Sequence, residues 1–168
     1  MDFRLRKSEI SEFNIALKLL KSAAEFLSDK NINQWGYWTN PPKEKIQWVK
    51  DGFKNREFYF IENQNQTILG MVRILKEDLL YWGDMNDSAM YIHSLVIEKR
   101  YIGQQIGKRV VQKIENDAKN RGIKYLRLDC DSSNENLCEY YTNIGFNKVG
   151  EKLLKLGKYN LYEKQLKF

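Results

Sequence analysis

The chain has 168 residues, a length typical of one domain with one hydrophobic core, and we expect residues 1–168 to form a single domain. Hydrophobic residues make up 42% of the chain and aromatic residues 13%, which excludes an intrinsically disordered protein. No apolar run approaches the ~20 residues that span a bilayer, and the N-terminal MDFRLRKSE lacks the apolar segment of a signal peptide. We therefore expect a soluble, cytoplasmic protein with no membrane partner.

The net charge of +6 would suit an anionic partner such as a nucleic acid or a polyphosphate compound. The basic residues are spread along the chain, however, and mostly alternate with acidic ones, as in KEKIQWVKDGFKNRE. Such a spread is typical of a solvated surface. We predict no nucleic-acid partner, and a basic nucleic-acid-binding protein remains the less favoured alternative.

The first third of the chain predicts a short strand followed by two amphipathic helices. Residues 2–6 alternate as in a strand, and Ser8 or Ser11 can cap the helix that follows. The apolar residues of this helix recur at helical spacing and are Phe13, Leu17, Leu20, Ala24 and Leu27. After a loop rich in Asn, Gly and Pro, Pro42 can open the second helix.

The middle of the chain predicts three strands. The runs REFYFIE at 56–62 and QTILGMVRILK at 66–76 are joined by a polar turn, which is a hairpin signal. The segment 79–89 is irregular. The run MYIHSLVI at 90–97 is rich in β-branched and aromatic residues and predicts the third strand.

The second half predicts two helices and three strands. Apolar residues that step by four mark a helix at 103–120, and KYLRLDC at 124–130 predicts a strand. A short helix at 134–144 ends before a glycine, the usual residue at a helix C-terminus. Two strands, at 146–154 and 159–167, close the chain.

The predicted order is β-α-α-β-β-β-α-β-α-β-β. The strand–helix–strand step in the second half requires a right-handed parallel crossover, whereas the hairpins on either side of it are antiparallel. We expect an α+β fold with α/β/α layers: a mixed, mostly antiparallel central sheet of six to seven strands with helices on both faces.

The segment from Leu95 to Lys108 joins a strand to a helix through a loop that contains Gly103 and Gly107. Unpaired N–H groups at a helix start carry partial positive charge and suit a phosphate, which glycines allow to approach closely. The spacing lacks the third glycine of a dinucleotide fingerprint and the Gly-Lys-Ser/Thr of a P-loop. Taken alone, the segment is either a phosphate-binding loop or a tight turn.

Asn134, Tyr141, Gly145 and Phe146 follow the spacing N-x-x-x-x-x-x-Y-x-x-x-G-F without a gap, after the strand LRLDC. Together with the loop before them, they resemble the GCN5-related N-acetyltransferase (GNAT) family, whose pyrophosphate loop reads Q/R-x-x-G-x-G/A. The resemblance is specific from about residue 91 to 150, and the predicted order of elements extends it along the chain. It implies a GNAT fold that uses acetyl-CoA as co-substrate and no metal.

Two positions of the loop depart from the family pattern. Ile102 stands where Gln or Arg is usual, and Gln105 stands where the first glycine of the pattern is expected. Ile102 removes a polar contact, whereas a side chain at position 105 need not block a phosphate that is bound by main-chain N–H groups. We expect weaker binding of coenzyme A at worst.

The resemblance implies the residues that bind acetyl-CoA. The strand before the loop would supply N–H donors to the thioester oxygen and a place for the pantetheine arm, and the loop would hold the pyrophosphate. The implied set is Leu95, Val96, Ile97, Ile102, Gly103, Gln104, Gln105, Ile106, Gly107, Lys108, Asn134 and Tyr140. For Asn134, a simple helix N-cap is an equal alternative.

Two residues are candidates for proton transfer. The resemblance matches Tyr141 to the family tyrosine that donates a proton to the leaving thiolate, with a core role as the alternative. His93 is the only histidine, on a strand whose alternation places it on one face with Tyr91, Leu95 and Ile97. It is either the general base for the acceptor amine or a structural hydrogen-bonding residue.

The two cysteines, Cys130 and Cys138, do not form the CxxC pair of a metal or redox site. Two reduced thiols in an intracellular protein are the simpler expectation, with a disulfide as the less favoured alternative. Cys138 falls one helical turn from Tyr141, where a buried thiol is the simpler interpretation than a nucleophile.

The resemblance places Trp35, Trp38 and Trp82 in loops that wall the acceptor site, although indoles more often pack in a core. Asp84 and Asp87 could attract a cationic amine or could be ordinary turn residues. We predict direct attack by a primary amine of a small molecule in a ternary complex, without a covalent enzyme intermediate. The alternatives are a non-catalytic acyl-CoA-binding module and a protein acceptor, and dimerisation, common in the family, leaves a homodimer open.

Overall fold

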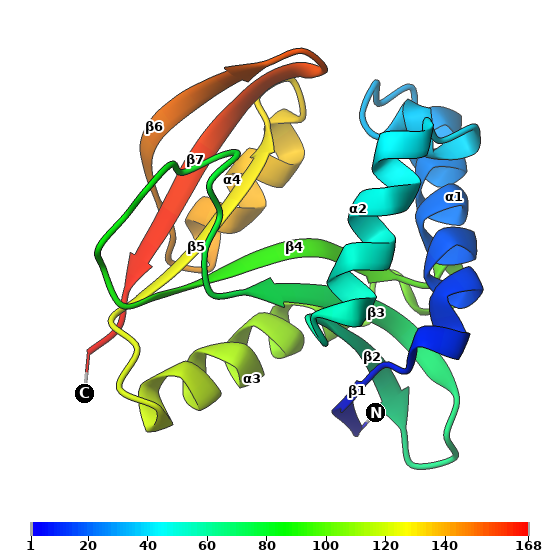
Figure 1. Ribbon diagram of the computed structural model, residues 1–168, viewed down its shortest axis with the longest axis horizontal. Helices are drawn as coiled ribbons and strands as arrows, with labels where there is room; N and C mark the ends of the chain where they lie inside the picture. Colours follow the sequence, from blue (N-terminus) through cyan, green and yellow to red (C-terminus); the bar gives the residue numbers. More distant parts are fainter. Residues whose placement is uncertain (1, 168) are drawn as a thin grey trace. The chain divides into compact units, whose positions relative to one another are not determined.

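The computed structural model describes residues 2–167, which form a seven-stranded sheet, four α-helices and three short 3-10 helices (Figure 1). The strands are β1 (Phe3–Lys7), β2 (Phe58–Asn63), β3 (Ile68–Leu75), β4 (Ala89–Ile97), β5 (Tyr125–Asp131), β6 (Asn147–Leu154) and β7 (Gly157–Gln165). The helices are η1 (Ile10–Glu12), α1 (Phe13–Asp29), η2 (Gly36–Thr39), α2 (Lys43–Lys54), η3 (Lys99–Tyr101), α3 (Ile106–Asn120) and α4 (Glu135–Asn143).

The strand order is β1-β2-β3-β4-β5-β7-β6. The β1–β2, β2–β3, β5–β7 and β6–β7 ladders are antiparallel, and the β4–β5 ladder, which the chain reaches through α3, is parallel. The predicted order of elements and the mixed, mostly antiparallel sheet are confirmed. None of the helices in the described chain is long and apolar enough to cross a membrane.

Two helix starts differ from the sequence prediction. The Ser8 hydroxyl donates to the Phe58 carbonyl at 3.0 Å instead of capping a helix, and the first turn begins at Glu9, whose N–H donates to the Glu12 carboxylate at 2.8 Å. Helix α3 begins at Ile106 rather than near 103. Gly103 and Gln105 have φ of +86° and +57°, and a right-handed helix cannot contain such residues.

The chain divides into two compact parts, with strand β4 split between them at His93 and Ser94. The first part comprises Met1–Ile74 and Ser94–Gly107, and the second comprises Leu75–His93 and Lys108–Phe168. In the first part, α1 and α2 lie side by side (Figure 1) and pack on β2 and β3. Phe53 of α2 stacks on Phe58 of β2 with ring centroids 4.8 Å apart.

A glycine fixes the approach of β3 to the end of β4 in the first part. A Cβ atom on Gly70 would collide with the Val96 carbonyl oxygen, so no larger residue allows this approach. Next to this contact, the N–H of Glu98, the residue that directly follows β4, donates to the Leu69 carbonyl at 2.8 Å. The backbone of Val96–Glu98 is thereby held against β3.

Charged side chains cross-link the second part. Arg127 of β5, whose side chain is 2% exposed, donates to Glu163 of β7 and to Asp87, both at 2.7 Å. Lys164 of β7 donates to Glu115 of α3 at 2.6 Å and to the Ile144 carbonyl at the end of α4 at 3.2 Å. These contacts tie the second-part strands to α3 and α4.

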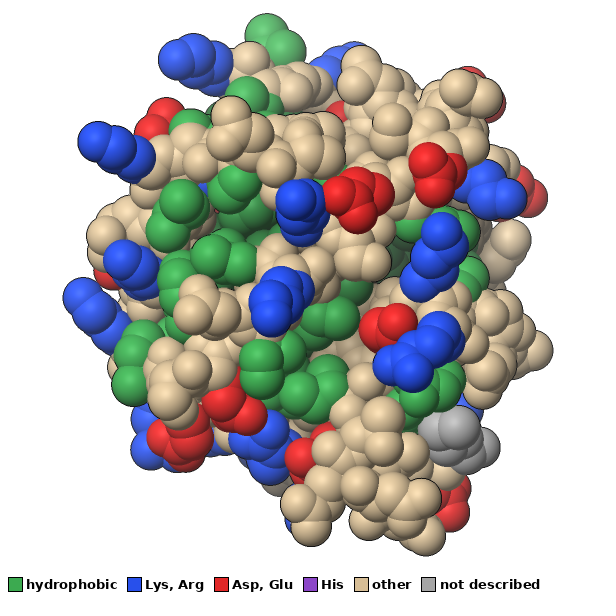
Figure 2. Space-filling model, turned by 90° about the vertical axis from the view of Figure 1, so that its right-hand side faces the viewer, with side chains coloured by type: hydrophobic (Ala, Val, Ile, Leu, Met, Phe, Trp, Pro, Cys, Tyr) green, Lys and Arg blue, Asp and Glu red, His purple; other side chains and the backbone are tan. Residues whose placement is uncertain are grey.

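The surface charges follow the pattern seen in the sequence. On the face shown in Figure 2, Lys and Arg side chains are dispersed among acidic and hydrophobic ones rather than gathered into one field. A nucleic-acid-binding surface needs a contiguous basic patch or stripe. This face of the molecule therefore offers no support for the nucleic-acid alternative.

Candidate functional site

Strand β4 changes its geometry at the junction of the two parts. The ladder with β5 pairs Ala89–Ile92 with Tyr125–Leu128 and ends directly before His93 and Asp129. Ser94, the next residue of β4, has a φ of +48°, which interrupts the regular alternation of a strand. The prediction that one alternating face runs from Tyr91 to Ile97 is therefore wrong at this residue.

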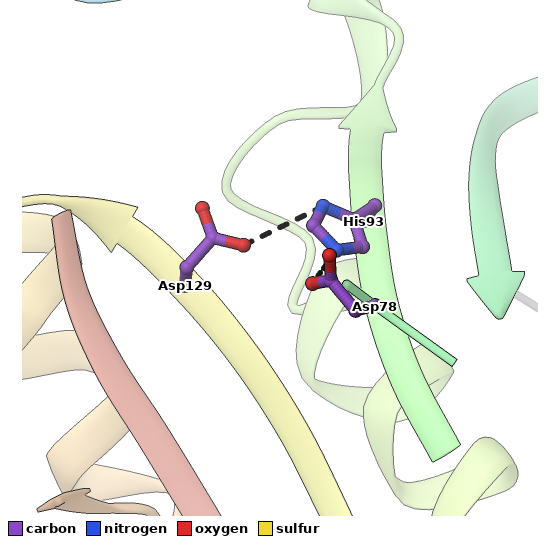
Figure 3. Close-up of side chains that lie close together, drawn as sticks. All are labelled: Asp78, His93 and Asp129. Carbon is purple, nitrogen blue, oxygen red and sulfur yellow. Dashed lines mark hydrogen bonds and ion pairs between the residues drawn. The ribbon is translucent and has the colours of Figure 1, made fainter. Parts of the chain in front are cut away.

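His93 lies between two carboxylates, both in the second part of the chain (Figure 3). Its Nε2 is 2.8 Å from Asp78 Oδ2, and its Nδ1 is 3.5 Å from Asp129 Oδ1. The three side chains are 10%, 5% and 9% exposed in the order His93, Asp78, Asp129. The Tyr81 ring lies against the imidazole with centroids 5.3 Å apart.

The same three side chains are of the types that bind metal ions, and their donor atoms lie within 4.8 Å of one another. The two carboxylates face different ring nitrogens, however. One ion bound through one imidazole nitrogen would reach both carboxylates only if the ring moved. The arrangement fits a hydrogen-bonded Asp–His–Asp group better than a metal site.

Sequence analysis found His93 but missed both of its partners. Asp129 could have been noticed as the acidic residue of the apolar run LRLDC, next to the strand that carries His93. Asp78 lies in the irregular segment between β3 and β4, where no periodicity constrains its position. Its backbone carbonyl accepts from Trp82 N–H at 2.9 Å and its carboxylate from Tyr81 N–H at 3.2 Å, so the segment folds around this residue.

Tyr141 of α4 is buried in the second part. Its ring packs against Tyr140, Phe146 and Tyr162 with centroid distances of 5.4, 6.0 and 6.2 Å. Burial raises the pKa of Tyr141 well above its ordinary value. The hydroxyl is therefore protonated near neutral pH and can donate a hydrogen bond. The packing shows the core role that the sequence left as one alternative, and the donor role stays a prediction.

The beginning of α4 is built by Asn134, whose side-chain oxygen accepts from the Leu137 N–H at 3.1 Å. The N-cap role is confirmed. Cys138 lies beside it on the same helix, and its Sγ is 3.2 Å from Cys130 Sγ of β5. Both thiols are free, and burial raises the pKa of the Cys130 thiol, which makes that residue a weak nucleophile.

The loop before α3 lies in the first part and has an alternating backbone. Ile102 is extended and 43% exposed, and Gly103 and Gln105 take left-handed conformations on either side of Gln104. Such alternation turns successive N–H groups in one direction and forms a concave anion-binding surface. The first N–H groups of α3 have no partners within the helix. The loop can therefore hold a phosphate through main-chain atoms alone.

The three tryptophans that the sequence offered for the acceptor site differ in their surroundings. Trp38 is 4% exposed in the core of the first part, and Trp35 packs against that core. Packing accounts for both. Trp82, in the second part, stacks over the Arg127 guanidinium at 4.9 Å. Because Arg127 also binds the Asp87 carboxylate, that aspartate is engaged in the fold.

Comparison with known proteins agrees with these features. The model of the acetyltransferase (GNAT) family matches residues 15–146. The chain is 28% identical over 155 residues to the uncharacterized N-acetyltransferase YesJ of Bacillus subtilis, covering 88% of this chain and 82% of that protein. It is 32% identical over 90 residues to N-alpha-acetyltransferase 30 of Schizosaccharomyces pombe, covering 54% of this chain and 57% of that protein.

Solved structures share the fold. A GNAT-family acetyltransferase from Listeria monocytogenes superimposes with a TM-score of 0.80 at 23% identity, over 98% of this chain and 95% of that one. One from Streptococcus agalactiae gives 0.79 at 14% identity, over 99% and 96%. Because the family model covers most of its length, the chain belongs to the GNAT family of acetyltransferases.

Proposed function

We propose that this protein is an acetyl-CoA-dependent N-acetyltransferase that acts as one catalytic domain. The acceptor is the primary amine of a small molecule, which attacks the thioester directly in a ternary complex. The observation that carries the proposal is the loop before α3, where Gly103 and Gln105 have φ of +86° and +57°. This backbone suits the pyrophosphate of coenzyme A although Ile102 and Gln105 depart from the family pattern, because main-chain N–H groups make the contact.

Most of the residues implied for acetyl-CoA, from Leu95 to Gly107, lie in the first part of the chain, and Lys108 directly follows them. Gly103 has open space where a Cβ atom would lie, so a phosphate can approach its backbone. Gln104, Ile106, Gly107 and Lys108 follow as the remainder of the loop and the first turn of α3. The backbone of Leu95–Ile97, of which Val96 and Ile97 lie against Gly70, would donate to the thioester oxygen as negative charge develops there.

Acetylation removes two protons from the nitrogen of an ammonium group, of which one is released to solvent and the other ends on the coenzyme A thiol. His93 takes the first proton and passes it to solvent. The electron pair of the broken N–H bond stays on the amine nitrogen. Tyr141 donates to the leaving thiolate, and the second proton of the amine ends on the coenzyme A thiol. Since burial raises the pKa of Tyr141, its contribution is a hydrogen bond to the thiolate more than complete loss of its proton.

The first test is the thermal midpoint of the purified protein with and without millimolar acetyl-CoA. A ligand that binds the native state raises the midpoint by mass action. We expect a rise with acetyl-CoA and with CoA and little change with ATP. No rise with acetyl-CoA would mean that Ile102 and Gln105 have disabled the loop, and the proposal would be withdrawn.

The second test is turnover, measured as release of the free thiol of coenzyme A in the presence of candidate amines. Small primary amines and peptides with a free N-terminal amine form the two arms, because N-alpha-acetyltransferase 30 is among the relatives. Turnover in the small-amine arm supports the proposal. Binding of acetyl-CoA with no turnover in either arm would favour the non-catalytic acyl-CoA-binding alternative.

A further inference from the structure

The Asp78–His93–Asp129 group allows a sharper statement about the acceptor, which rests on the proposed function. We infer that Asp78 positions His93 so that Nδ1 is the basic atom, and that Asp129 holds the acceptor ammonium beside it. Asp78 is then a positioning residue, and Asp129 contacts the substrate. The site accordingly prefers a cationic alkylamine without a neighbouring carboxylate over an α-amino acid.

The hydrogen bond to Asp78 determines which ring nitrogen carries the proton. A carboxylate only accepts hydrogen bonds, so the 2.8 Å contact requires a proton on Nε2. In the neutral imidazole the other nitrogen, Nδ1, then has the lone pair. A buried carboxylate that fixes the tautomer and orientation of a catalytic histidine is an established physical device. Asp78 is itself fixed by the Tyr81 N–H at 3.2 Å.

The second carboxylate lies on the basic side of the ring. Asp129 Oδ1 is 3.5 Å from Nδ1, longer than a direct hydrogen bond between the two groups. Two acceptors this close can receive two N–H groups of one ammonium. When the ammonium gives a proton to Nδ1, the N–H bond breaks, its electron pair stays on the amine, and the new imidazolium lies between two carboxylates that stabilise it.

The charged groups near His93 determine which other functional groups the acceptor molecule can contain. Among the described contacts, the titratable groups that face the imidazole are Asp78, Tyr81 and Asp129, and the Tyr81 ring in turn packs on Tyr159 of β7 at 5.2 Å. Asp131 adds a carboxylate two residues along β5 and acts on Tyr159. A carboxylate on the carbon next to the amine would lie close to these acidic groups and be repelled by them. The aromatic rings, in contrast, attract a cation.

His93 is the only histidine of the chain, so its imidazole signals are unambiguous in a protein without tag histidines. Long-range 1H–15N NMR spectra report which nitrogen is protonated, and this readout needs no turnover. We expect the proton of the neutral form on Nε2 in the wild type, and a shift towards the other tautomer in Asp78→Asn. Glu77→Gln, which removes an exposed carboxylate from the neighbouring residue, is the control and should match the wild type.

Kinetics provides the second readout. Asp78→Asn should lower kcat/KM at least about tenfold near neutral pH and move the acid limb of its pH profile to lower pH, since the neutral imidazole is favoured when a facing carboxylate is lost. Asp78→Glu should restore part of the activity. Asp129→Asn should raise KM for the amine more than it lowers kcat.

Matched acceptors test the specificity. 1,4-Diaminobutane should be acetylated faster than ornithine, and phenethylamine faster than phenylalanine, because each pair differs only by the α-carboxylate. Equal rates within both pairs would overturn the acceptor assignment. A rise in thermal midpoint with Zn²⁺ or Mn²⁺ that is lost in Asp78→Asn would overturn it in favour of a metal site.

The failures of the two proposals are distinguishable. A proton on Nδ1 in the neutral wild type, or identical spectra and pH profiles for Asp78→Asn and Glu77→Gln, would overturn the positioning role while acetyl transfer stands. The expected NMR spectra together with no acetyl transfer to any amine would keep the positioning role and remove the proposed function.

Discussion

The two parts of the molecule offer different kinds of chemistry. In the first part, the candidate contacts are backbone N–H groups, held by the left-handed Gly103 and Gln105 and by the approach of β3 to β4 at Gly70. In the second part, they are side chains: His93 between two aspartates, and the buried Tyr141. A backbone site tolerates changes of side chain as long as the conformation is kept, whereas a side-chain site does not. Under the proposed function, this difference would allow the loop to depart from its family pattern and still bind coenzyme A.

The largest expected effect is in the second part. Tyr141→Phe removes a buried hydroxyl and keeps the ring packing against Phe146 and Tyr162. We expect kcat to fall by about 100-fold with little change in the KM for acetyl-CoA, because only the stabilisation of the leaving thiolate is lost.

Steady-state kinetics at saturating acetyl-CoA measures this effect, and Tyr125→Phe, at a half-buried tyrosine of β5 outside the candidate site, is the control. An unchanged kcat in Tyr141→Phe would contradict the view that the second part contributes to catalysis through the Tyr141 side chain. It would also revive the interpretation of the protein as an acyl-CoA-binding module.

The next largest effect tests the backbone contacts of the first part. Gly70→Ala places a methyl group against the Val96 carbonyl oxygen, so β3 and the end of β4 must separate. We expect a loss of stability on the order of 3 kcal/mol, or roughly 6–12 °C in thermal midpoint, and weaker binding of acetyl-CoA. Differential scanning fluorimetry measures the first effect, and titration calorimetry measures the second.

Gly36→Ala is the control, because a Cβ atom there meets nothing within 4 Å. This variant should be as stable as the wild type or slightly more stable. A Gly70→Ala protein with wild-type stability and acetyl-CoA affinity would contradict the view that this close approach fixes the β4 backbone.

A smaller effect separates stability from catalysis within the first part. Glu62 of β2 accepts hydrogen bonds from Arg4 and Arg6 of β1 at 2.8 and 3.1 Å. The hydrogen bond from Arg4, with a further one from Arg6, holds the pKa of the Glu62 carboxyl below its ordinary value. A carboxyl with a lowered pKa in the folded state stabilises the protein above its ordinary pKa of ~4.3, and this contribution is lost as the pH falls through the folded-state value.

Glu62→Gln should therefore lower stability by about 1–2 kcal/mol at pH 7, and the difference from the wild type should shrink below about pH 4. Denaturant unfolding between pH 3 and pH 8 measures it. The turnover of the folded variant should equal that of the wild type. A difference that persists unchanged at pH 3 would show that packing, not charge, is responsible.

The sequence predicted the fold more completely than the site. Helical and strand periodicities identify every main element, because each buries one apolar face, and the motif around Tyr141 identifies the family. The starts of α1 and α3 were missed because they depend on local backbone conformations, such as the φ of +57° at Gln105. The periodicity of a polar loop sequence does not indicate such conformations. Asp78 was missed because it lies in an irregular segment. Only the folded structure brings it next to His93.

The smallest expected effect tests the backbone interpretation most directly. Gln105 has a φ of +57°, a conformation that disfavours residues with a Cβ atom by roughly 1–2 kcal/mol, whereas glycine adopts it readily. Glycine also loses more conformational freedom on folding, which offsets part of this gain. Gln105→Gly should therefore raise the free energy of unfolding by about 0.5–1 kcal/mol and the thermal midpoint by roughly 1–4 °C. The affinity for acetyl-CoA should stay equal or increase.

The same substitution one residue earlier is the matched control. Gln104 is not among the residues with positive φ, so Gln104→Gly has no strain to relieve and should lower the thermal midpoint. If Gln105→Gly instead weakened acetyl-CoA binding more than Gln104→Gly, the Gln105 side chain would contribute to the contact. The first part would then use side chains as the second part does, and the departure from the family glycine would be a functional feature of this chain rather than a tolerated strain.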